Sequence, residues 1–156
     1  MIKLVSESEL LNCLEVPRKF ERKIVFTNGC YDILHIGHVD LLEHCKRLGD
    51  ILVVGLNSDS SVKRLKGESR PVFNQSERVK MLSALETVDY IVMFDEDTPL
   101  NLIEKITPDI LVKGTDWERN VVGQEWVEKN GGAVVLATLT EGYSTTDIIE
   151  RIKKMK

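Results

Sequence analysis

Two histidines lie three residues apart around a glycine, at His35-Ile36-Gly37-His38, in a chain that contains only three histidines. An i, i+3 spacing at the start of a helix directs both side chains to one side, where they could bind different oxygens of one phosphate. Gly37 would let backbone amides approach the same anion. Taken alone, the pair could equally be a surface histidine and a helix cap. A metal pair is disfavoured because no third ligand has a suitable spacing.

A cluster of hydroxyl side chains, Ser144-Thr145-Thr146, precedes the apolar positions Ile148, Ile149 and Ile152. Serine and threonine are good helix caps and poor helix-interior residues, so this pattern predicts a helix that begins with free amides and hydroxyls. Such a terminus can bind phosphate. The plain alternative is a cap that holds no ligand.

A third candidate is the stretch 57–74, predicted to be a long irregular loop, which contains Lys63, Arg64, Lys66 and Arg70. Long loops that follow a buried strand are often functional. Basic residues in such a loop could bind anionic substrates, or they could form an ordinary solvated surface.

The elements that must position these residues follow a βαβ pattern. Apolar runs of strand length alternate with amphipathic segments, which predicts a Rossmann-like α/β fold: a doubly wound, parallel, five-stranded sheet with helices on both faces. The predicted strands contain residues 24–26, 51–56, 90–94, 110–112 and 133–137. Ligands bind beyond the carboxyl ends of such strands, and the segment Thr27–His38 leaves the first strand there.

Start and stop signals place the helices. Residues 39–48 have helical spacing and end at Gly49, and Asn74 with Glu77 reads as a capping pair that opens a helix to about Glu86. Thr98-Pro99 is typical of another helix start. Ser6 and Glu9 mark a leading helix within residues 1–20, and residues 1–156 are expected to form a single domain.

Composition limits the function classes. The chain has 156 residues, a net charge of −4 and a pI near 5.5, so neither nucleic acid nor an anionic membrane is an expected partner. No apolar run approaches the roughly 18 residues that span a bilayer. Three cysteines without ligand spacing read as free thiols, and a cytoplasmic location is expected.

The HxGH tetrad and the segment Glu141–Ile149, EGYSTTDII, together resemble the HxGH nucleotidyltransferases of the cytidylyltransferase-like group. Within that group the chain is most similar to the adenylyltransferases of heptose biosynthesis, which also share the segments FTNGCYDILHIGHVDLL, GLNSDSSVKRLKGESRPV, ERVKMLSALETVDYIVMF and PDILVKGTDW. The resemblance implies transfer of AMP from ATP to D-glycero-β-D-manno-heptose 1-phosphate, which yields ADP-heptose and pyrophosphate.

Two alternatives stay open. A cytidylyltransferase for glycerol 3-phosphate or a similar polyol or amino-alcohol phosphate is disfavoured because Leu139 stands where those enzymes have arginine, and because the segment KGTDW lacks their paired aspartates. A more distant alternative is a non-catalytic ATP-binding module.

The motifs and the resemblance together predict the site. The catalytic residues are His35, His38 and Lys66. The nucleotide-binding residues are Thr27, Asn28, Gly29, Cys30, Asp32, Gly37, Lys113, Gly114, Asp116, Tyr143, Ser144, Thr145 and Thr146. The resemblance further implies that Lys66, Arg70 and Arg78 bind the phosphates of the substrates. No protein metal site is predicted, and Mg²⁺ is expected to be held mainly by the ATP phosphates. The resemblance also implies a homodimer and a separate sugar kinase upstream.

Overall fold

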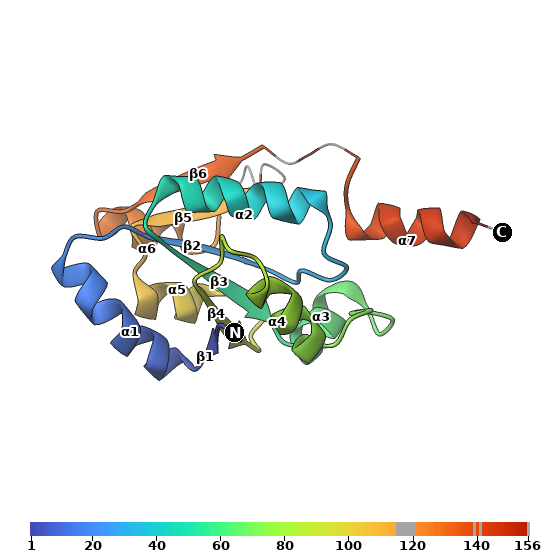
Figure 1. Cartoon of the computed structure of the whole chain (residues 1–156), viewed down its shortest axis with the longest axis horizontal. Coiled ribbons are helices and arrows are strands. Elements are labelled where there is room, and N and C mark those ends of the chain that lie inside the picture. The colour runs from blue at the N-terminus through green and yellow to red at the C-terminus, as the bar shows by residue number, and fades with distance from the viewer. Residues whose placement is uncertain (115–120, 139, 141, 156) are drawn as a thin grey trace.

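The computed structural model describes residues 1–114, 121–138, 140 and 142–155 (Figure 1). They form a parallel sheet in the order β1-β4-β3-β2-β5-β6. The strands are β1 (Leu4–Val5), β2 (Ile24–Gly29), β3 (Ile51–Asn57), β4 (Tyr90–Phe94), β5 (Ile110–Gly114) and β6 (Ala133–Ala137). The predicted fold class is confirmed, with six strands in place of the five expected. The extra strand, β1, has only two residues, so it has too few positions to show a periodicity.

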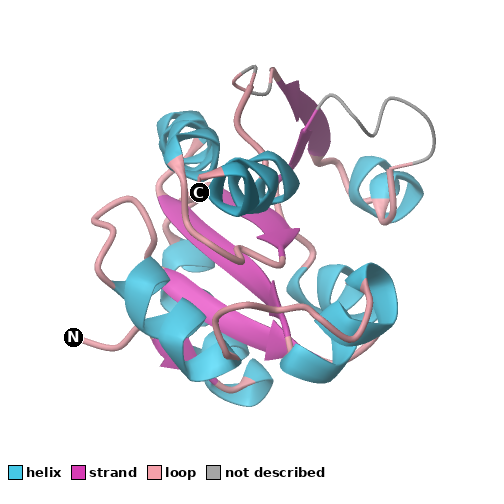
Figure 2. Ribbon diagram, turned by 90° about the vertical axis from the view of Figure 1, so that its right-hand side faces the viewer, coloured by secondary structure: helices cyan, strands magenta, loops and turns pink. Residues whose placement is uncertain are grey.

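Seven helices lie in the described part of the chain: α1 (Glu7–Lys19), α2 (Ile36–Leu48), α3 (Asp59–Lys66), α4 (Gln75–Ser83), α5 (Leu100–Ile106), α6 (Gln124–Lys129) and α7 (Thr145–Lys154). Figure 2 shows helices on both sides of the sheet. The packing divides accordingly, because α1, α5 and α6 contribute to one buried cluster and α2 and α4 to the other. Neighbouring strand residues alternate between the clusters, as Phe26 and Val25 do, so both faces of the sheet are covered.

Two of the capping predictions are confirmed. Ser6 and Glu9 form a reciprocal capping box at α1, and Asn74 and Glu77 form one at α4. The predicted boundaries differ elsewhere by a few residues: α2 begins at Ile36, α4 ends at Ser83, and Pro99 is the cap of α5 instead of its first residue.

The prediction of an irregular stretch over residues 57–74 is wrong for its first half. Helix α3 fills Asp59–Lys66, and the Ser58 side chain accepts a hydrogen bond from the Ser61 amide at its start. The apolar periodicity of this helix is weak in the sequence because the helix is short and largely polar. Val62 and Ser61 bury one side, while Lys63 and its basic neighbours face solvent.

The fold brings the carboxyl ends of β2, β3 and β5 together at one edge of the sheet. Strand β2 pairs in parallel with β3 on one side and with β5 on the other. Strands β3 and β4 are therefore added on one side of β2, whereas β5 and β6 are added on its other side. Such a reversal opens a crevice at the carboxyl edge. No helix in the described part of the chain has the length and apolar composition needed to cross a membrane.

Candidate active site

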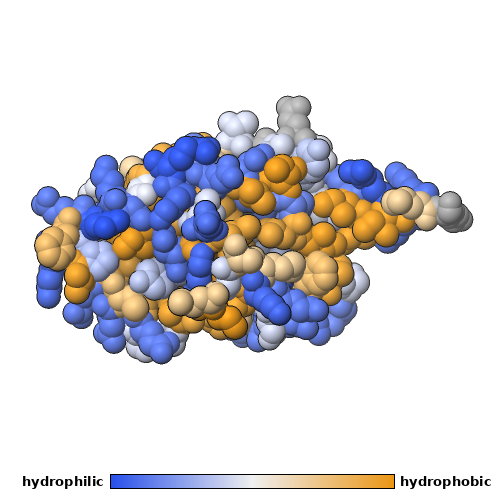
Figure 3. Space-filling model, viewed as in Figure 1, coloured by the Kyte–Doolittle hydropathy of each residue, from blue (hydrophilic) through white to orange (hydrophobic). Residues whose placement is uncertain are grey.

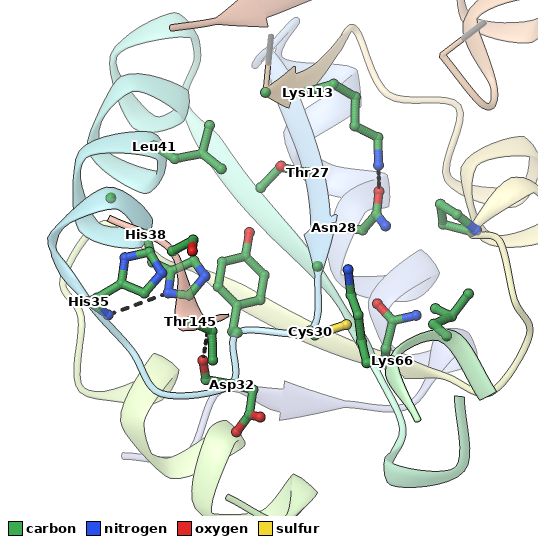
Figure 4. Close-up of a pocket in the computed structure, with 18 of the residues that line it drawn as sticks. Thr27, Asn28, Cys30, Asp32, His35, His38, Leu41, Lys66, Lys113 and Thr145 are labelled. Atoms are coloured by element: carbon green, nitrogen blue, oxygen red, sulfur yellow. Dashed lines mark hydrogen bonds between the residues drawn. The ribbon is translucent and has the colours of Figure 1, made fainter. Parts of the chain in front are cut away.

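A cavity of about 590 Å³ opens at this carboxyl edge (Figure 4). It is bordered by the ends of β2, β3 and β5, by the start of α2 and by the segment that leads into α7. The predicted residues that line it are Thr27, Asn28, Gly29, Cys30, Asp32, His35, Gly37, His38, Lys66, Arg70, Lys113, Gly114, Tyr143, Ser144, Thr145 and Thr146. The structure therefore gathers most of the predicted site into one cavity. Asp116 lies outside the described residues.

The two histidines stand at the entry to α2, with His35 as the cap and His38 in the first turn. Their rings stack with centroids 3.7 Å apart and planes inclined by 28°, and the His35 amide donates to His38 Nδ1 over 3.4 Å. A Cβ atom on Gly37 would lie 3.1 Å from the His35 ring and 3.4 Å from the Tyr143 carbonyl oxygen. Glycine at this position therefore lets the imidazole and the segment before α7 approach α2 closely.

Both imidazoles are neutral at neutral pH in this arrangement. Burial lowers the pKa of His35. Burial also lowers the pKa of His38 to about 3, helped by repulsion from His35 whenever that ring is protonated and opposed slightly by the Asp32 carboxylate. His35 Nδ1 is buried and has no hydrogen-bond partner among the described residues. A buried nitrogen without a partner is costly, so a ligand in the cavity could satisfy it.

The start of α7 meets the same cavity wall. Ser144 Oγ accepts a hydrogen bond from the Asp147 amide at 3.0 Å, as the sequence predicts for a cap. Thr145 Oγ1 donates to the backbone oxygen of Asp32 at 2.6 Å, which ties the helix start to the turn before the HxGH tetrad. Figure 4 shows this bond and both histidines on the same side of the cavity. Two motifs that are far apart in the sequence thus converge on one space.

Asp32 lines the cavity, and its side chain is also bound by the 70–73 segment. Its buried carboxylate accepts hydrogen bonds from Arg70 Nε at 2.6 Å and from the Val72 and Phe73 amides at 2.9 and 3.0 Å. Burial alone would raise its pKa, but these hydrogen bonds outweigh burial and hold the pKa below its ordinary value. The carboxylate is therefore committed to the 70–73 segment.

This contact also supports a strained turn. Tyr31 and Ile33, on either side of Asp32, have positive φ angles of 49° and 54°. Such a backbone is unfavourable for bulky residues and persists only where the surroundings hold it. The bonds of Asp32 to the 70–73 segment and to Thr145 supply that support next to the histidines.

The prediction that Arg78 binds substrate phosphate is corrected by the structure. Its side chain is fully buried, and its guanidinium donates to the carbonyl oxygens of Phe73, Cys30 and Asn57 and to the Asp59 carboxylate at 2.7–3.1 Å. It does not line the cavity. Arg78 instead joins the ends of β2 and β3 to the start of α4, so it positions the cavity wall from behind.

The cations that do reach the cavity differ in their surroundings. Lys66 is exposed at the end of α3 and has no hydrogen bond or ion pair with any described residue, and Figure 4 shows its side chain beside Cys30. Burial raises the pKa of the Cys30 thiol in spite of the nearby Lys66, Arg78 and Arg70, so the thiol is protonated at neutral pH and is a poor nucleophile. Lys113 at the end of β5 donates to Asn28 Oδ1 at the end of β2.

Sequence reasoning missed several residues of the cavity wall. Asp97, Thr98 and Pro99 follow β4, and Val121, Val122 and Thr140 lie beyond β5 and β6. Apart from Thr98-Pro99, which reads as a helix start, their position after strands was the only available signal, because the others form no motif. Arg64 donates to Asp97 at 2.8 Å and so restrains this wall.

Comparison with known proteins agrees with the fold and the motifs. The sequence model of the family described as Cytidylyltransferase-like matches residues 26–151. Bifunctional protein HldE of Syntrophotalea carbinolica is 54% identical over 151 residues, which are 96% of this chain and 31% of that protein. Bifunctional protein HldE of Campylobacter concisus is 57% identical over 155 residues, which are 99% of this chain and 32% of that protein.

The chain thus spans about a third of the length of these relatives. Among solved structures, the lipopolysaccharide core biosynthesis protein of Thermoplasma volcanium matches with a TM-score of 0.63 and 31% identity, over 79% of this chain and 99% of that one. The family match extends from β2 to α7 and so includes both motifs that converge on the cavity. The chain therefore belongs to the cytidylyltransferase-like family of nucleotidyltransferases.

Proposed function

We propose that this chain transfers the adenylyl group of ATP to D-glycero-β-D-manno-heptose 1-phosphate and releases pyrophosphate. The observation that carries the proposal is the convergence of the histidine pair and the α7 start on one cavity. The resemblance to adenylyltransferases of heptose biosynthesis supplies the substrates, and similarity to a lipopolysaccharide core biosynthesis protein supports a role in making a surface-polysaccharide precursor.

In the proposed reaction, an oxygen of the sugar phosphate attacks the α-phosphorus of ATP in line with the bond to the bridging oxygen. That bond breaks as the new P–O bond forms, and its electron pair leaves with pyrophosphate. The protein needs no covalent intermediate, so positioning and charge stabilisation supply the catalysis.

The histidines suit this role as hydrogen-bond donors. Each neutral imidazole has one N–H to offer, and the stacking distance of 3.7 Å disfavours two positive rings in the free protein. Anionic phosphate in the cavity would favour protonation of the pair and strengthen its bonds to the α-phosphate and the bridging oxygen as charge develops there.

Other groups would hold the remaining charge. Ser144, Thr145 and Thr146 line the cavity, where the backbone amides at the start of α7 can bind the β- and γ-phosphates. Lys66 and Arg70 also border the cavity and can bind the phosphate of the acceptor. Adenine would lie against the β5 end at Lys113 and Gly114.

Magnesium is proposed to enter as its complex with ATP, where it neutralises part of the triphosphate charge. In the described ranges, no three histidine, cysteine or acidic side chains are grouped closely enough to hold a metal ion. The Asp32 carboxylate is already occupied by Arg70 and two amides. Phosphate oxygens and water would therefore provide most of its ligands.

The wider setting is part of the same proposal. A sugar kinase must supply the 1-phosphate, and the protein would act in the cytoplasm as a homodimer.

The test is incubation of the protein with magnesium, ATP or CTP, and a panel of sugar 1-phosphates and polyol phosphates, with mass detection of the nucleotide product. ADP-heptose from ATP and heptose 1-phosphate is the expected result. A CDP-polyol product would replace the proposal with the cytidylyltransferase alternative. Nucleotide binding without pyrophosphate release for any acceptor would indicate a binding module.

A further inference from the structure

Part of the cavity wall carries oxygen atoms that accept hydrogen bonds, whereas the groups assigned above to phosphate are donors or cations. Asn57 at the end of β3 and Asp97 in the segment after β4 both line the cavity. We call these two residues the Asn57–Asp97 wall. Asp32 also lines the cavity, but the 70–73 segment already occupies its carboxylate. The Asn57–Asp97 wall has no part in the phosphate contacts proposed above.

The orientation of the Asn57 amide follows from its hydrogen bonds. Ser61 Oγ donates its proton to the Glu96 carbonyl oxygen at 2.9 Å, so towards Asn57 it can only accept. The Asn57 atom that lies 3.0 Å from Ser61 Oγ is therefore the donor Nδ2, and Oδ1 points away from Ser61. Oδ1 accepts no hydrogen bond within the described ranges, and it is not sealed from solvent. Because Asn57 lines the cavity, this oxygen is available to a ligand there.

Arg64 holds the Asp97 carboxylate in a comparable way. Arg64 Nε on α3 donates to Asp97 Oδ1 at 2.8 Å, and Figure 3 shows mainly hydrophilic side chains around α3 and α4. The second oxygen, Oδ2, accepts no hydrogen bond from the described part of the chain. The guanidinium thus fixes one oxygen of Asp97 and leaves the other for a ligand.

The chemistry of these two oxygens selects the part of a substrate that can bind them. A phosphate would be repelled by the Asp97 carboxylate, and it has no proton to donate to the Asn57 amide oxygen. A sugar hydroxyl is neutral and donates a proton, and its hydrogen bond to a carboxylate is strengthened by the charge. The Asn57–Asp97 wall therefore suits the hydroxyl-bearing part of a substrate.

The order of the strands favours the sugar of the acceptor over the ribose of ATP. Strands β3 and β4, which lead to Asn57 and Asp97, lie on one side of β2, and β5 lies on its other side. Lys66 ends α3, two residues after Arg64, and it also lines the cavity. In the proposed function Lys66 binds the acceptor phosphate and adenine lies at β5. The sugar that carries that phosphate then falls on the side of β3 and β4.

We propose that Asn57 Oδ1 and Asp97 Oδ2 bind hydroxyl groups of the acceptor sugar, and that Arg64 is a positioning residue for Asp97. The inference rests on the proposed function for the choice of the acceptor over the nucleotide. It assigns to these oxygens the preference for a sugar phosphate over a phosphate without a sugar.

The test compares Asp97→Asn with Glu96→Gln, its neighbour in the same segment. Arg64 would hold the oxygen of the introduced amide, so an NH₂ group would replace Oδ2 and a donor would replace an acceptor. Glu96→Gln makes the same change of charge at an exposed residue that does not line the cavity.

Calorimetry measures the dissociation constants of D-glycero-β-D-manno-heptose 1-phosphate, mannose 1-phosphate and inorganic phosphate. The titrations are made with and without α,β-methylene-ATP, which cannot release pyrophosphate. Steady-state kinetics measures the KM for ATP, and thermal unfolding shows whether each variant is folded.

Asp97→Asn should weaken binding of heptose 1-phosphate about tenfold, because a hydrogen bond to a charged group is lost, and should not weaken binding of inorganic phosphate. Glu96→Gln should bind every ligand as the wild type does. Asn57→Leu should show the same selective loss, and if it fails to fold, Asp97→Asn decides alone. Arg64→Met should weaken the sugar phosphate less than Asp97→Asn does, with an unchanged unfolding midpoint, which a merely structural role would not produce.

Three results would overturn the inference. The first is an Asp97→Asn variant that binds heptose 1-phosphate as tightly as the wild type, or that loses affinity equally for inorganic phosphate. The second is a loss confined to the KM for ATP, which would assign the wall to ribose. The third is a wild type that binds both sugar phosphates no more tightly than inorganic phosphate.

The binding measurements need no turnover, so the two proposals fail separately. A chain that binds heptose 1-phosphate through Asp97 but releases no pyrophosphate from ATP would remove only the proposed function. A chain that makes ADP-heptose, and whose Asp97→Asn variant keeps full affinity for the sugar phosphate, would remove only the role of the Asn57–Asp97 wall.

Discussion

Replacing Arg78 by methionine should destabilise the whole protein, although its sequence position suggested a substrate contact. The buried guanidinium donates to three carbonyl oxygens and to the Asp59 carboxylate. Methionine fills part of the same volume and restores none of these bonds. The Asp59 side chain is 33% exposed and can regain water, whereas the Asn57 carbonyl bond is buried.

Orphaned buried acceptors cost about 1–3 kcal/mol each, and loss of one partner of a buried ion pair costs about 3–5 kcal/mol. Allowing for the water that Asp59 regains, the free energy of unfolding should fall by about 3–5 kcal/mol. At about 2–4 °C per kcal/mol for a domain of this size, the Tm should drop by about 6–20 °C.

Urea denaturation and thermal unfolding measure this loss directly. Arg64→Met is the matched control, because Arg64 makes its ion pair with Asp97 at the exposed surface. This substitution should leave the unfolding midpoint unchanged. Arg78→Lys should fall between the wild type and methionine, since it keeps the charge with fewer donors. The structural role of Arg78 is wrong if the free energy of unfolding of Arg78→Met lies within about 1 kcal/mol of the wild type while the KM for ATP rises sharply. That result would instead support direct contact between Arg78 and a substrate phosphate.

Three further predictions concern the cavity. His38→Ala should lower kcat at least about a hundredfold with little change in ATP binding, whereas His44→Ala, on α2 outside the cavity, should keep normal turnover; equal rates for the two would remove the histidine role. The pKa of His38 is held at about 3 by burial and by the neighbouring imidazole, so the unfolded chain binds more protons below pH 6.5 and stability falls as the pH drops. Between pH 6.5 and 5 His38 should lower the free energy of unfolding by roughly 1–2 kcal/mol, and urea titrations of His38→Asn should not show this loss. If the pH dependence of stability is the same in His38→Asn and the wild type, the His38 ring is charged in the folded protein. Lys66→Ala should raise the KM for a phosphate substrate at least about tenfold, while Lys63→Ala, which does not border the cavity, should not; steady-state kinetics of the pair will show whether Lys66 contacts an anion.

The fold class and the two phosphate motifs could be read from the chain because they depend on short-range patterns. Strands that are apolar on both faces identify a covered parallel sheet, and the direction of its crossovers follows from chirality. Ser6, Asn74 and Ser144 cap helices because a short polar side chain reaches amides two or three residues ahead. Neighbours in the sequence settle these features, so no tertiary contact is needed.

Residues whose role depends on burial were not predictable in this way. Arg78 and Asp32 are charged, and charged side chains are usually exposed, yet partners from distant segments bury both. The strand β1 and the wall at Asp97–Pro99 gain their meaning only from the elements that pack beside them.

The ionisation of the histidines and the exposure of Ile152 and Met155 at the end of α7 belong to the tertiary structure for the same reason. An imidazole in sequence is a group that titrates near neutrality, and only the surrounding packing makes His38 neutral. An amphipathic pattern in residues 148–155 predicts a helix with an apolar face, but whether its own chain covers that face depends on where the helix starts and in which direction it runs. Hydrogen bonds and apolar periodicity act over a few residues, whereas solvent exclusion is a property of the assembled whole.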